Sequence, residues 1–386
     1  MIKSIEVKNF KSIKKKYFPL RKLNLLLGLN GMGKSSFIQS LLLLRQSDRL
    51  MYGELKLNGD YIKIGSTKDA LYQYSKKNEE LSLAFQFDDS ELVKLEFGYE
   101  MESDVFKLKD PKSNPYGVHE QFQKLVTQSL FGNNFQYLNA SRLEPTSVHN
   151  KGFTFVVSLK NLGMFGEFTT HYIEVHGNEE IQFDNLLHKD SSTKDTVTGK
   201  ELINKSLINQ INLWMGEISP GINVRTTAIP NSENILLEYV YKQPNFGSTN
   251  RFKPINVGFG ISYSLPIVTA LLSARPGELI IIENPESHIH PRGQAELGKL
   301  ISLVALNDIQ VIIETHSDHV LNGVRVAAKE NEKLRDDAIV FFFDKKIEEA
   351  EQYSDITDVE IDKNGELSSY PKNLLDEWGQ QMIKLI

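Results

Sequence analysis

The sequence predicts an α/β fold: a mainly parallel central sheet, an N-terminal β-rich lobe and segments inserted in the middle of the chain. Three observations lead to this prediction. An apolar run, 23–27, precedes a glycine-rich loop and a Leu-rich stretch without Gly or Pro, 36–45, as in a buried strand, a loop and a helix. The last third alternates apolar strands with helices, which is typical of a parallel sheet covered on both faces. Between them, residues 52–98 show short alternating segments and turn signals, which predict further β-strands.

The N-terminal elements begin with a strand. Residues 2–10 alternate apolar and polar side chains, as a half-buried strand does. With 16–20 and 23–27 they predict a small β-meander that leads into the glycine-rich loop. The polar residues 101–130 predict a loop, and the charged segment 171–200 predicts an insertion with a mobile stretch.

The remaining elements follow from hydrophobic periodicity. The middle of the chain contributes a strand at 135–139, a helix at 202–215 and a strand pair within 224–241. The last third contributes helices at 261–274, 292–306 and 316–328, strands at 279–282, 311–314 and 338–344, and a final helix from about 373. Because the glycine-rich loop and the last strands lie at opposite ends of the chain, they must meet in one sheet. We predict domain boundaries near residues 50, 250 and 345.

The glycine-rich loop, Gly28 to Ser35, fits the pattern G-x-x-x-x-G-K-[ST] of phosphate-binding loops. A predicted strand before it and a helix after it supply the context in which this pattern is specific. The glycines allow backbone N–H groups to surround a phosphate, and the helix N-terminus adds a positive dipole end. We expect Lys34 to reach the β- and γ-phosphates and the Ser35 hydroxyl to bind Mg²⁺. The predicted ligands of a nucleotide within this stretch are Asn30, Gly31, Gly33, Lys34, Ser35 and Ser36.

An acidic residue follows the predicted apolar strand at 279–282. Glu283 comes directly after four aliphatic residues, as does the acid that a buried strand delivers to Mg²⁺ beside bound phosphates. Ser35 and Glu283 are therefore the predicted metal-binding residues. The predicted cofactors are ATP and Mg²⁺.

Composition excludes several classes of protein. The chain of 386 residues has no cysteine, so it has neither a disulfide framework nor a thiolate metal site. The N-terminus lacks the apolar core of a signal peptide, and no apolar run approaches the length of a membrane span, so we expect a cytoplasmic protein. The net charge of −6 argues against an indiscriminate nucleic-acid binder.

One basic cluster remains open to two interpretations. It comprises Lys8, Lys11, Lys14, Lys15, Lys16, Arg21 and Lys22. The cluster is either an edge that faces DNA or phosphate, or a solvated hairpin whose lysines protect a sheet edge.

The chain resembles the ABC-type ATPases of the branch that includes RecF, the SMC proteins and the ATPase half of OLD-family nucleases. Within this branch it is similar to proteins that carry the DUF3696 C-terminal domain. The resemblance is carried by five stretches: Val7 to Ile13, Gly28 to Ser35, Val257 to Ser262, Ile282 to Pro291 and Glu314 to His319. It implies a P-loop ATPase head of the AAA family.

The resemblance also implies roles for particular residues. Lys11 stands where relatives have a basic residue near the phosphates, and His316 stands at the histidine that senses the γ-phosphate. Gly258, Gly260 and Ser262 stand at the signature motif, which in relatives contacts the nucleotide of the opposite subunit. A head-to-tail homodimer, or a higher oligomer, is therefore expected.

The chain departs from the pattern of these relatives at two acidic positions. The strand acid is Glu283 rather than Asp, and the next position, normally the catalytic Glu, is Asn284. Asn cannot accept a proton from water, although an amide can orient it, and Glu286 is a candidate substitute base. We expect slow hydrolysis. His288 and His290 alternate with Glu286, which is compatible with a transition-metal site or, more simply, with structural histidines.

The resemblance favours an ATP-driven molecular switch that senses or clamps nucleic acid, with double-stranded DNA as a candidate ligand. This switch would control a separate effector protein such as a nuclease or toxin. Bacterial anti-phage (antiviral) defence is the expected setting, and RecF-like DNA repair is the alternative. A nucleotide-dependent scaffold with little hydrolysis is the rival class. No heptad repeat and no Asp-x-Asp motif after the last strands are present, so we expect neither a coiled-coil arm nor a nuclease half.

Overall fold

The computed structural model describes residues 1–75, 80–88, 92–100, 102–109, 127–194, 201–243 and 247–385. The chain forms two compact units. Unit 1 comprises Met1–Phe135, Asp336–Asp362 and Leu367–Ile386, and unit 2 comprises Gln136–Arg335 and Lys363–Glu366. Both ends of the chain thus belong to the same unit. Most of the loop predicted at 101–130 and residues 195–200 of the predicted mobile stretch lie outside the described residues. The boundaries predicted from the sequence stay predictions.

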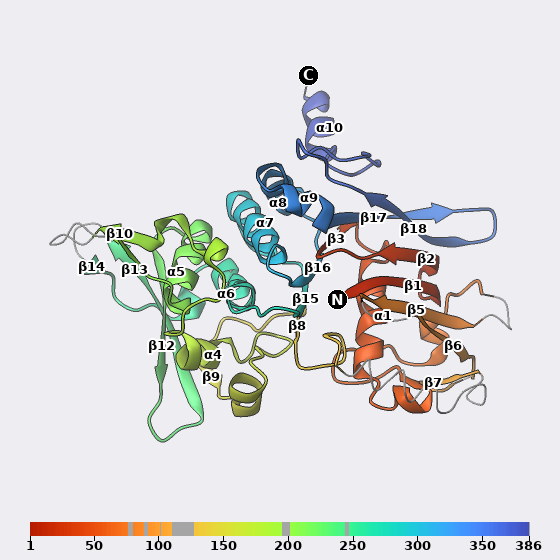
Figure 1. Ribbon diagram of the computed structural model, residues 1–386, viewed down its shortest axis with the longest axis horizontal. Helices are drawn as coiled ribbons and strands as arrows, with labels where there is room; N and C mark the ends of the chain where they lie inside the picture. The colour runs from red at the N-terminus through yellow and green to blue at the C-terminus, as the bar shows by residue number, and fades with distance from the viewer. Residues whose placement is uncertain are drawn as a thin grey trace. The chain divides into compact units, whose positions relative to one another are not determined.

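Unit 1 contains an antiparallel sheet with the strand order β2-β1-β5-β6-β7-β4 (Figure 1). Its strands are β1 (Ile2–Phe10), β2 (Ile13–Pro19), β4 (Glu54–Lys56), β5 (Leu81–Phe87), β6 (Val93–Gly98) and β7 (Val105–Leu108). The apolar side chains of β1 that face the core, such as Ile5 and Val7, are fully buried. This sheet confirms the predicted β-rich lobe.

The strand that leads into the glycine-rich loop, β3 (Leu23–Gly28), belongs to a different sheet from β1 and β2. It pairs in parallel with β17 (Ala338–Ile347), and β17 pairs antiparallel with β18 (Gln352–Val359). The prediction of a three-stranded meander was therefore wrong. The physical reason is that the core residues of β3 are buried on both faces, as in a central parallel strand, rather than on alternate residues. The pairing confirms that the two ends of the chain share a sheet.

The core of unit 1 lies where helix α1 (Lys34–Gln46) packs against these strands. The ring of Phe18 lies 4.3 Å from that of Phe37 in α1 and 5.2 Å from that of Phe341 in β17, measured between centroids. These buried rings join the N-terminal hairpin to the last strands. Among its described residues, unit 1 also has the short helices η1 (Leu50–Tyr52), α2 (Thr67–Ala70) and α10 (Glu377–Lys384).

Unit 2 contains parallel strands β15 (Leu279–Glu283) and β16 (Gln310–Glu314), whose last residues are paired in register. Strand β8 (Phe135–Leu138) lies next to β15. The helices around them are α6 (Phe259–Leu272), α7 (Pro291–Ala305), α8 (Asp318–Glu330) and α9 (Glu332–Asp337). Helices α7 and α8 run side by side in Figure 1. Because parallel strands deliver their ends to one edge, the residues after β15 and β16 become neighbours.

The rest of unit 2 contains both strands and helices. Its strands are β9 (Val148–Asn150), β10 (Ser192–Lys194), β11 (Glu201–Ile203), β12 (Ile222–Ala228), β13 (Asn234–Gln243) and β14 (Gly247–Ser248). Its other helices are η2 (Thr154–Ser158), α4 (Thr169–His176), η3 (Asp184–Leu186), η4 (Lys189–Ser191), α5 (Leu207–Ile218) and η5 (Pro254–Asn256). The predicted strand pair within 224–241 is confirmed.

Two predictions about unit 2 need correction. The helix expected from residue 202 begins at Leu207, because 201–203 pair with β10 as a hairpin. The segment predicted as an insertion from residue 171 begins within α4. That helix buries Tyr172 and Ile173, and its charged neighbours concealed this apolar face in the sequence.

The longest helices of the described part of the chain are α7 and α6, with 15 and 14 residues. A helix needs about 20 residues to cross a bilayer. Among the described residues, therefore, no helix combines the length and apolar character of a membrane span.

Candidate nucleotide-binding site

The glycine-rich loop has a backbone that only glycine tolerates at two positions. Gly28 and Gly33 have φ angles of 138° and 107°. A Cβ at Gly28 would lie 2.1 Å from the carbonyl oxygen of Phe343, and one at Gly33 would lie 2.2 Å from the Ser354 Oγ. Gly33 is also the N-cap of α1, and its position carries no side-chain cap. The loop therefore closes directly onto the start of a helix, the geometry that favours anion binding.

Lys34 lies within the curve of this loop. Its Nζ donates hydrogen bonds to the carbonyl oxygens of Gly28 at 2.7 Å and Leu29 at 2.9 Å, and the residue is buried. Ser35, the next residue, is exposed, whereas Ser36 is buried. The ammonium group is thus the cation of the loop, and the Ser35 side chain is the one that the first turn of α1 presents to solvent.

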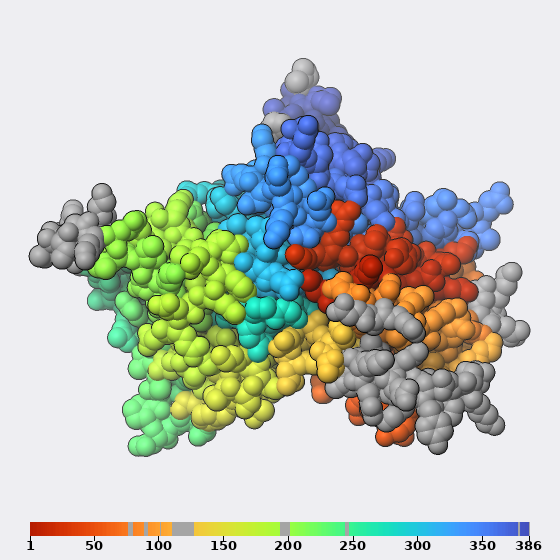
Figure 2. Space-filling model, viewed as in Figure 1, coloured from red at the N-terminus to blue at the C-terminus, as the bar shows by residue number. Residues whose placement is uncertain are grey.

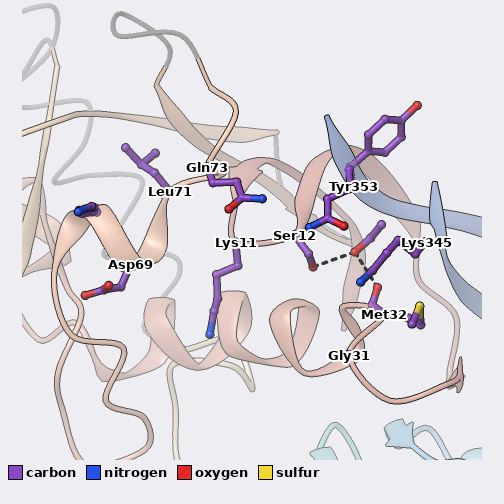
Figure 3. Close-up of a pocket in the computed structure, with 12 residues that line it drawn as sticks. Lys11, Ser12, Gly31, Met32, Asp69, Leu71, Gln73, Lys345 and Tyr353 are labelled. Atoms are coloured by element: carbon purple, nitrogen blue, oxygen red, sulfur yellow. Dashed lines mark hydrogen bonds between the residues drawn. The ribbon is translucent and has the colours of Figure 1, made fainter. Parts of the chain in front are cut away.

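A cavity of about 380 Å³ opens beside the loop in unit 1 (Figure 3). Its lining residues come from the loop, from the β1–β2 turn, from α2 and its surroundings, and from the β17–β18 hairpin: Lys11, Ser12, Gly31, Met32, Lys68, Asp69, Leu71, Gln73, Lys345, Gln352, Tyr353 and Ser354. The Ser354 Oγ donates to the Met32 carbonyl oxygen at 2.7 Å and bonds the Ser12 Oγ at 2.8 Å. These bonds fasten the glycine-rich loop to the last strands.

Lys11 extends from this cavity toward α1 (Figure 3). Its Nζ donates to the Gln39 Oε1 at 2.7 Å. Burial lowers the pKa of Lys11, and the nearby Asp69 carboxylate partly opposes that shift. Lys11 has a φ of 51°, so the β1–β2 turn directs its side chain toward α1 from a left-handed backbone conformation.

Five of the seven residues of the basic cluster form ion pairs with acidic residues of the same unit. Lys16 lies 2.6 Å from the Asp358 carboxylate and Lys22 lies 3.2 Å from that of Asp337. Further ion pairs join Lys14 to Glu351, Lys15 to Glu6 and Arg21 to Glu360. Figure 2 shows the N-terminal residues, in red, beside the blue residues of β17 and β18 on the surface. This pairing favours the structural interpretation of the cluster over a DNA-facing edge.

In unit 2, Glu283 ends β15 and has two hydrogen-bond donors. The Tyr137 hydroxyl donates to its Oε1 at 2.9 Å, and the Ala140 backbone N–H donates to its Oε2 at 3.3 Å. Burial raises the pKa of Glu283, and these two hydrogen bonds oppose the shift. Sequence reasoning missed Tyr137. The available signal was a tyrosine within a buried strand, because a buried hydroxyl needs a partner.

Arg142 holds the main chain that follows Glu283. Its guanidinium donates to the carbonyl oxygens of Asn139 at 3.1 Å, Glu283 at 2.8 Å and Asn284 at 2.6 Å. Only 4% of the residue is exposed, and burial lowers its pKa to about 10. Arg142 is therefore a buried cation that binds backbone carbonyl oxygens.

Asn284 has a left-handed backbone, with a φ of 45°. Its N–H donates to the Glu314 carbonyl oxygen at 2.8 Å. Its Oδ1 is inaccessible to solvent and has no hydrogen-bond partner among the described residues. Asparagine tolerates this backbone conformation better than most residues, so the amide at this position is compatible with the turn that Arg142 holds.

The structure brings Glu286 and His316 together, as the ends of two neighbouring parallel strands require. The Glu286 carboxylate accepts hydrogen bonds from the Thr315 hydroxyl at 2.7 Å and from the His316 backbone N–H at 2.8 Å. The His316 residue itself is exposed.

His288 and His290 have structural contacts. His290 accepts a hydrogen bond from the Arg292 N–H at the start of α7, and the His288 ring lies 5.0 Å from that of Tyr263. In the part of the chain that the structure describes, no group of three His, Asp, Glu or Cys side chains is placed to hold a metal ion. The contacts of the two histidines favour their structural interpretation.

The three signature residues have different environments. Gly258 is exposed at the N-cap of α6. Gly260 is buried, and a Cβ there would lie 2.2 Å from the His288 carbonyl oxygen. The Ser262 Oγ is inaccessible to solvent, so this hydroxyl is not presented at the start of the helix. Phe259, which is 52% exposed, is presented instead.

The predicted site residues are thus divided between the units. Unit 1 carries Lys11 and the loop from Asn30 to Ser36, and unit 2 carries Glu283, Asn284, Glu286, His316 and the signature residues. The joint action of Ser35 and Glu283 on one Mg²⁺ stays a prediction.

Comparisons with known proteins identify the family and the fold of the chain. Residues 23–322 match the family model described as "AAA domain, putative AbiEii toxin, Type IV TA system", and residues 335–385 match a protein family of unknown function, DUF3696. No curated protein matches the sequence. Among solved structures, the chain is similar to an Smc head bound to the C-winged helix domain of ScpA, with 15% identity, a TM-score of 0.54, and 94% of this chain and 98% of that chain covered.

A second solved structure gives a comparable result. It is an Smc head domain with an extended coiled coil, bound to the C-terminal domain of ScpA, derived from Pyrococcus furiosus. The identity is 12%, the TM-score is 0.50, and 100% of this chain and 98% of that chain are covered. At such identities the likeness establishes the fold, which is that of an SMC-type ATPase head.

Proposed function

Because this chain belongs to the AAA domain family described above and has the fold of an SMC head, we propose that it binds ATP with Mg²⁺ and hydrolyses it slowly as a molecular switch. The observation that carries the proposal is the loop that ends at Gly33 and opens directly onto α1, with the Lys34 ammonium inside its curve. This combination is the chemistry of a triphosphate-binding loop.

In the proposed complex the phosphates replace the loop carbonyls as partners of Lys34. The N–H groups of 30–36 surround the β-phosphate, and Lys34 donates to the β- and γ-phosphates. The adjoining cavity of about 380 Å³, which includes Lys11, Gln73 and Tyr353, takes the nucleoside. Polar and aromatic side chains are both present there, as a base and a ribose require.

The metal and the attacking water are assigned to the residues that follow the strands. Ser35 and Glu283 are the proposed Mg²⁺ ligands, the second directly or through water. Glu283 is suited to this role because a cation would stabilise the charged form of a carboxylate that burial disfavours. Asn284 can orient water but cannot take its proton, which makes slow turnover the expected behaviour.

The proposed switch is a head-to-tail homodimer that ATP closes through the exposed start of α6, where Gly258 and Phe259 are accessible. Its open and closed forms would control a separate effector protein, with anti-phage defence as the proposed setting. A RecF-like repair role is the alternative. The ion pairs of the N-terminal hairpin weaken the case for DNA binding through that cluster, so direct binding of double-stranded DNA would need another surface.

The test compares the wild-type chain with Lys34→Ala and with Lys22→Ala, a matched control whose ammonium is paired with Asp337. ATP affinity, phosphate release and solution mass are measured with and without duplex DNA. The proposal expects Lys34→Ala to abolish ATP binding and turnover, and Lys22→Ala to retain both. Equal ATP affinity in all three chains would overturn it.

The same measurements separate the switch from the scaffold. A switch turns ATP over and returns to the lower mass as nucleotide is consumed. A scaffold stays assembled with ATP and releases no phosphate above the Lys34→Ala background. A DNA role requires binding at low salt that weakens steeply as salt rises.

A further inference from the structure

The segments that follow β15 and β16 are braced against each other by the Glu286 side chain. Its Oε2 accepts a hydrogen bond from the Thr315 hydroxyl, and its Oε1 accepts one from the His316 backbone N–H. Both carboxylate oxygens are therefore engaged by the two residues that lead out of β16. Hydrogen bonds to a charged acceptor are about twice as strong as neutral ones, so this contact is a strong constraint on the backbone of His316.

A second set of hydrogen bonds holds the backbone on the other side of His316. The Ser317 Oγ donates to the Gln294 Oε1 at 2.5 Å and accepts from the N–H groups of His319 and Val320, both at 3.1 Å. The Gln294 Nε2 in turn donates to the Ile289 carbonyl oxygen at 2.8 Å. Residue 316 is thus held between Glu286 on one side and the N-cap of α8 on the other.

The helices that start after these segments make the arrangement rigid. Gly323 of α8 approaches α7 so closely that a Cβ there would lie 2.1 Å from the Ala295 carbonyl oxygen. The backbone around His316 therefore cannot shift without disturbing the α7–α8 contact, while its imidazole belongs to an exposed residue.

We infer that Glu286 is a positioning residue that sets His316 toward the nucleotide, and that it is not the base for the attacking water. A base must take up a proton on an oxygen. Protonation of Glu286 would remove the negative charge that strengthens its hydrogen bonds from the Thr315 hydroxyl and the His316 N–H, so a proton taken from water would weaken the contact that holds His316. The inference rests on the proposed ATP hydrolysis, in which His316 acts at the γ-phosphate.

A double-mutant cycle distinguishes the two roles. ATP turnover is measured for the wild type, Glu286→Gln, His316→Ala and the double variant. A positioning role expects Glu286→Gln to lower turnover about tenfold alone and less than twofold when His316 is already alanine. A base that acts directly on water would lower turnover by the same factor in both backgrounds, which would overturn the inference.

Thr315→Val provides a milder variant, because it removes one of the two bonds to Glu286 and leaves both charges in place. It is expected to lower turnover severalfold, again only when His316 is present. If Glu286→Gln fails to fold, Thr315→Val in the two His316 backgrounds completes the same cycle, with the same overturning result.

A readout without nucleotide separates this inference from the proposed function. In the chain with labelled histidines, NMR is expected to show that Glu286→Gln and Thr315→Val move the His316 imidazole signal, whereas the His149 signal stays in place. If the wild type hydrolyses no ATP but the His316 signal moves, the proposed hydrolysis fails and the positioning contact stands. An unmoved His316 signal in both variants would refute the positioning contact.

Discussion

The buried guanidinium of Arg142 gives the prediction whose magnitude the structure defines most closely. Arg142→Leu keeps an apolar stem in place and removes the three hydrogen bonds to the carbonyl oxygens of Asn139, Glu283 and Asn284. The turn after β15 then loses the group that holds it, and unit 2 should lose stability.

Two opposing effects decide the size of the loss. Hydrogen bonds from a charged donor contribute about 1.5–3 kcal/mol each. Burial works against these hydrogen bonds, because it lowers the pKa of Arg142 from its ordinary value to about 10, which corresponds to about 3 kcal/mol against the charged form. Removing the cation also leaves carbonyl groups without a donor, at about 1 kcal/mol or more. The balance of these effects lowers the free energy of unfolding by about 3 kcal/mol. For a unit of this size, that loss corresponds to a decrease of roughly 8 °C in the midpoint of thermal unfolding.

The assay uses one of the two tryptophans of the chain as a reporter of unit 2. Trp214 is buried, and its Nε1 donates to the Leu186 carbonyl oxygen at 2.9 Å. In a Trp378→Phe background, urea unfolding followed by fluorescence then reports the free energy of unfolding around Trp214. Arg142→Leu and its control are compared with the parent chain in this background.

The matched control is Arg292→Leu. The Arg292 side chain is 69% exposed and makes an ion pair with Glu217 at 3.0 Å, so its loss should change the free energy of unfolding by less than about 1 kcal/mol. If Arg142→Leu is no more destabilising than Arg292→Leu, the assignment of Arg142 as the group that holds this turn is refuted.

Three further predictions concern the same units. Asn284→Glu should raise phosphate release at saturating ATP about tenfold or more, because a carboxylate can accept a proton that an amide cannot, and an unchanged rate would contradict this reasoning. Burial raises the pKa of Glu283 above 4.5, so the folded chain binds this proton more tightly than the unfolded chain, and stability falls as pH rises from about 4.5 through the folded pKa. Glu283→Gln should therefore stabilise the metal-free protein more at pH 8 than at pH 5 in urea unfolding, and an equal effect at both would count against a raised pKa. Gly323→Ala should destabilise the chain by about 2 kcal/mol or more, because the new Cβ would lie 2.1 Å from a carbonyl oxygen. Gly216→Ala, in α5 with no atom within 4 Å of the new Cβ, should instead stabilise it by up to about 1 kcal/mol, and equal changes in thermal unfolding would contradict the packing argument.

Much of the fold was predictable because its signals are local. The strand–loop–helix at 23–46 and the apolar strands that became β15, β16 and β17 are recognised from neighbouring residues alone. Local patterns also misled. The pattern that predicted a helix from 202 did not distinguish the strand at 201–203, which exists because β10 pairs with it. Whether β3 joined the N-terminal hairpin or the last strands depended on partners far away in the chain.

The candidate site likewise has parts that local sequence patterns predict and parts that depend on distant segments. The residue types that bind phosphate and metal were visible as motifs, since Lys34, Ser35 and Glu283 stand at characteristic places after strands. The residues that hold those motifs in place were not visible. Tyr137 and Arg142 reach Glu283 across more than a hundred residues, and no spacing rule in the sequence connects them.

The sequence by itself therefore determined the class of chemistry: a glycine-rich loop before a helix, and an acid at the end of a buried strand. The tertiary structure decided the surroundings on which that chemistry depends. It paired the hairpin lysines with acids, turned Ser262 inward and joined Glu286 to the backbone of His316. The physical reason is that the two kinds of interaction act over different separations along the chain. Backbone conformation and periodicity act between neighbouring residues, whereas burial, hydrogen-bond partners and ion pairs depend on which distant segments the fold brings together.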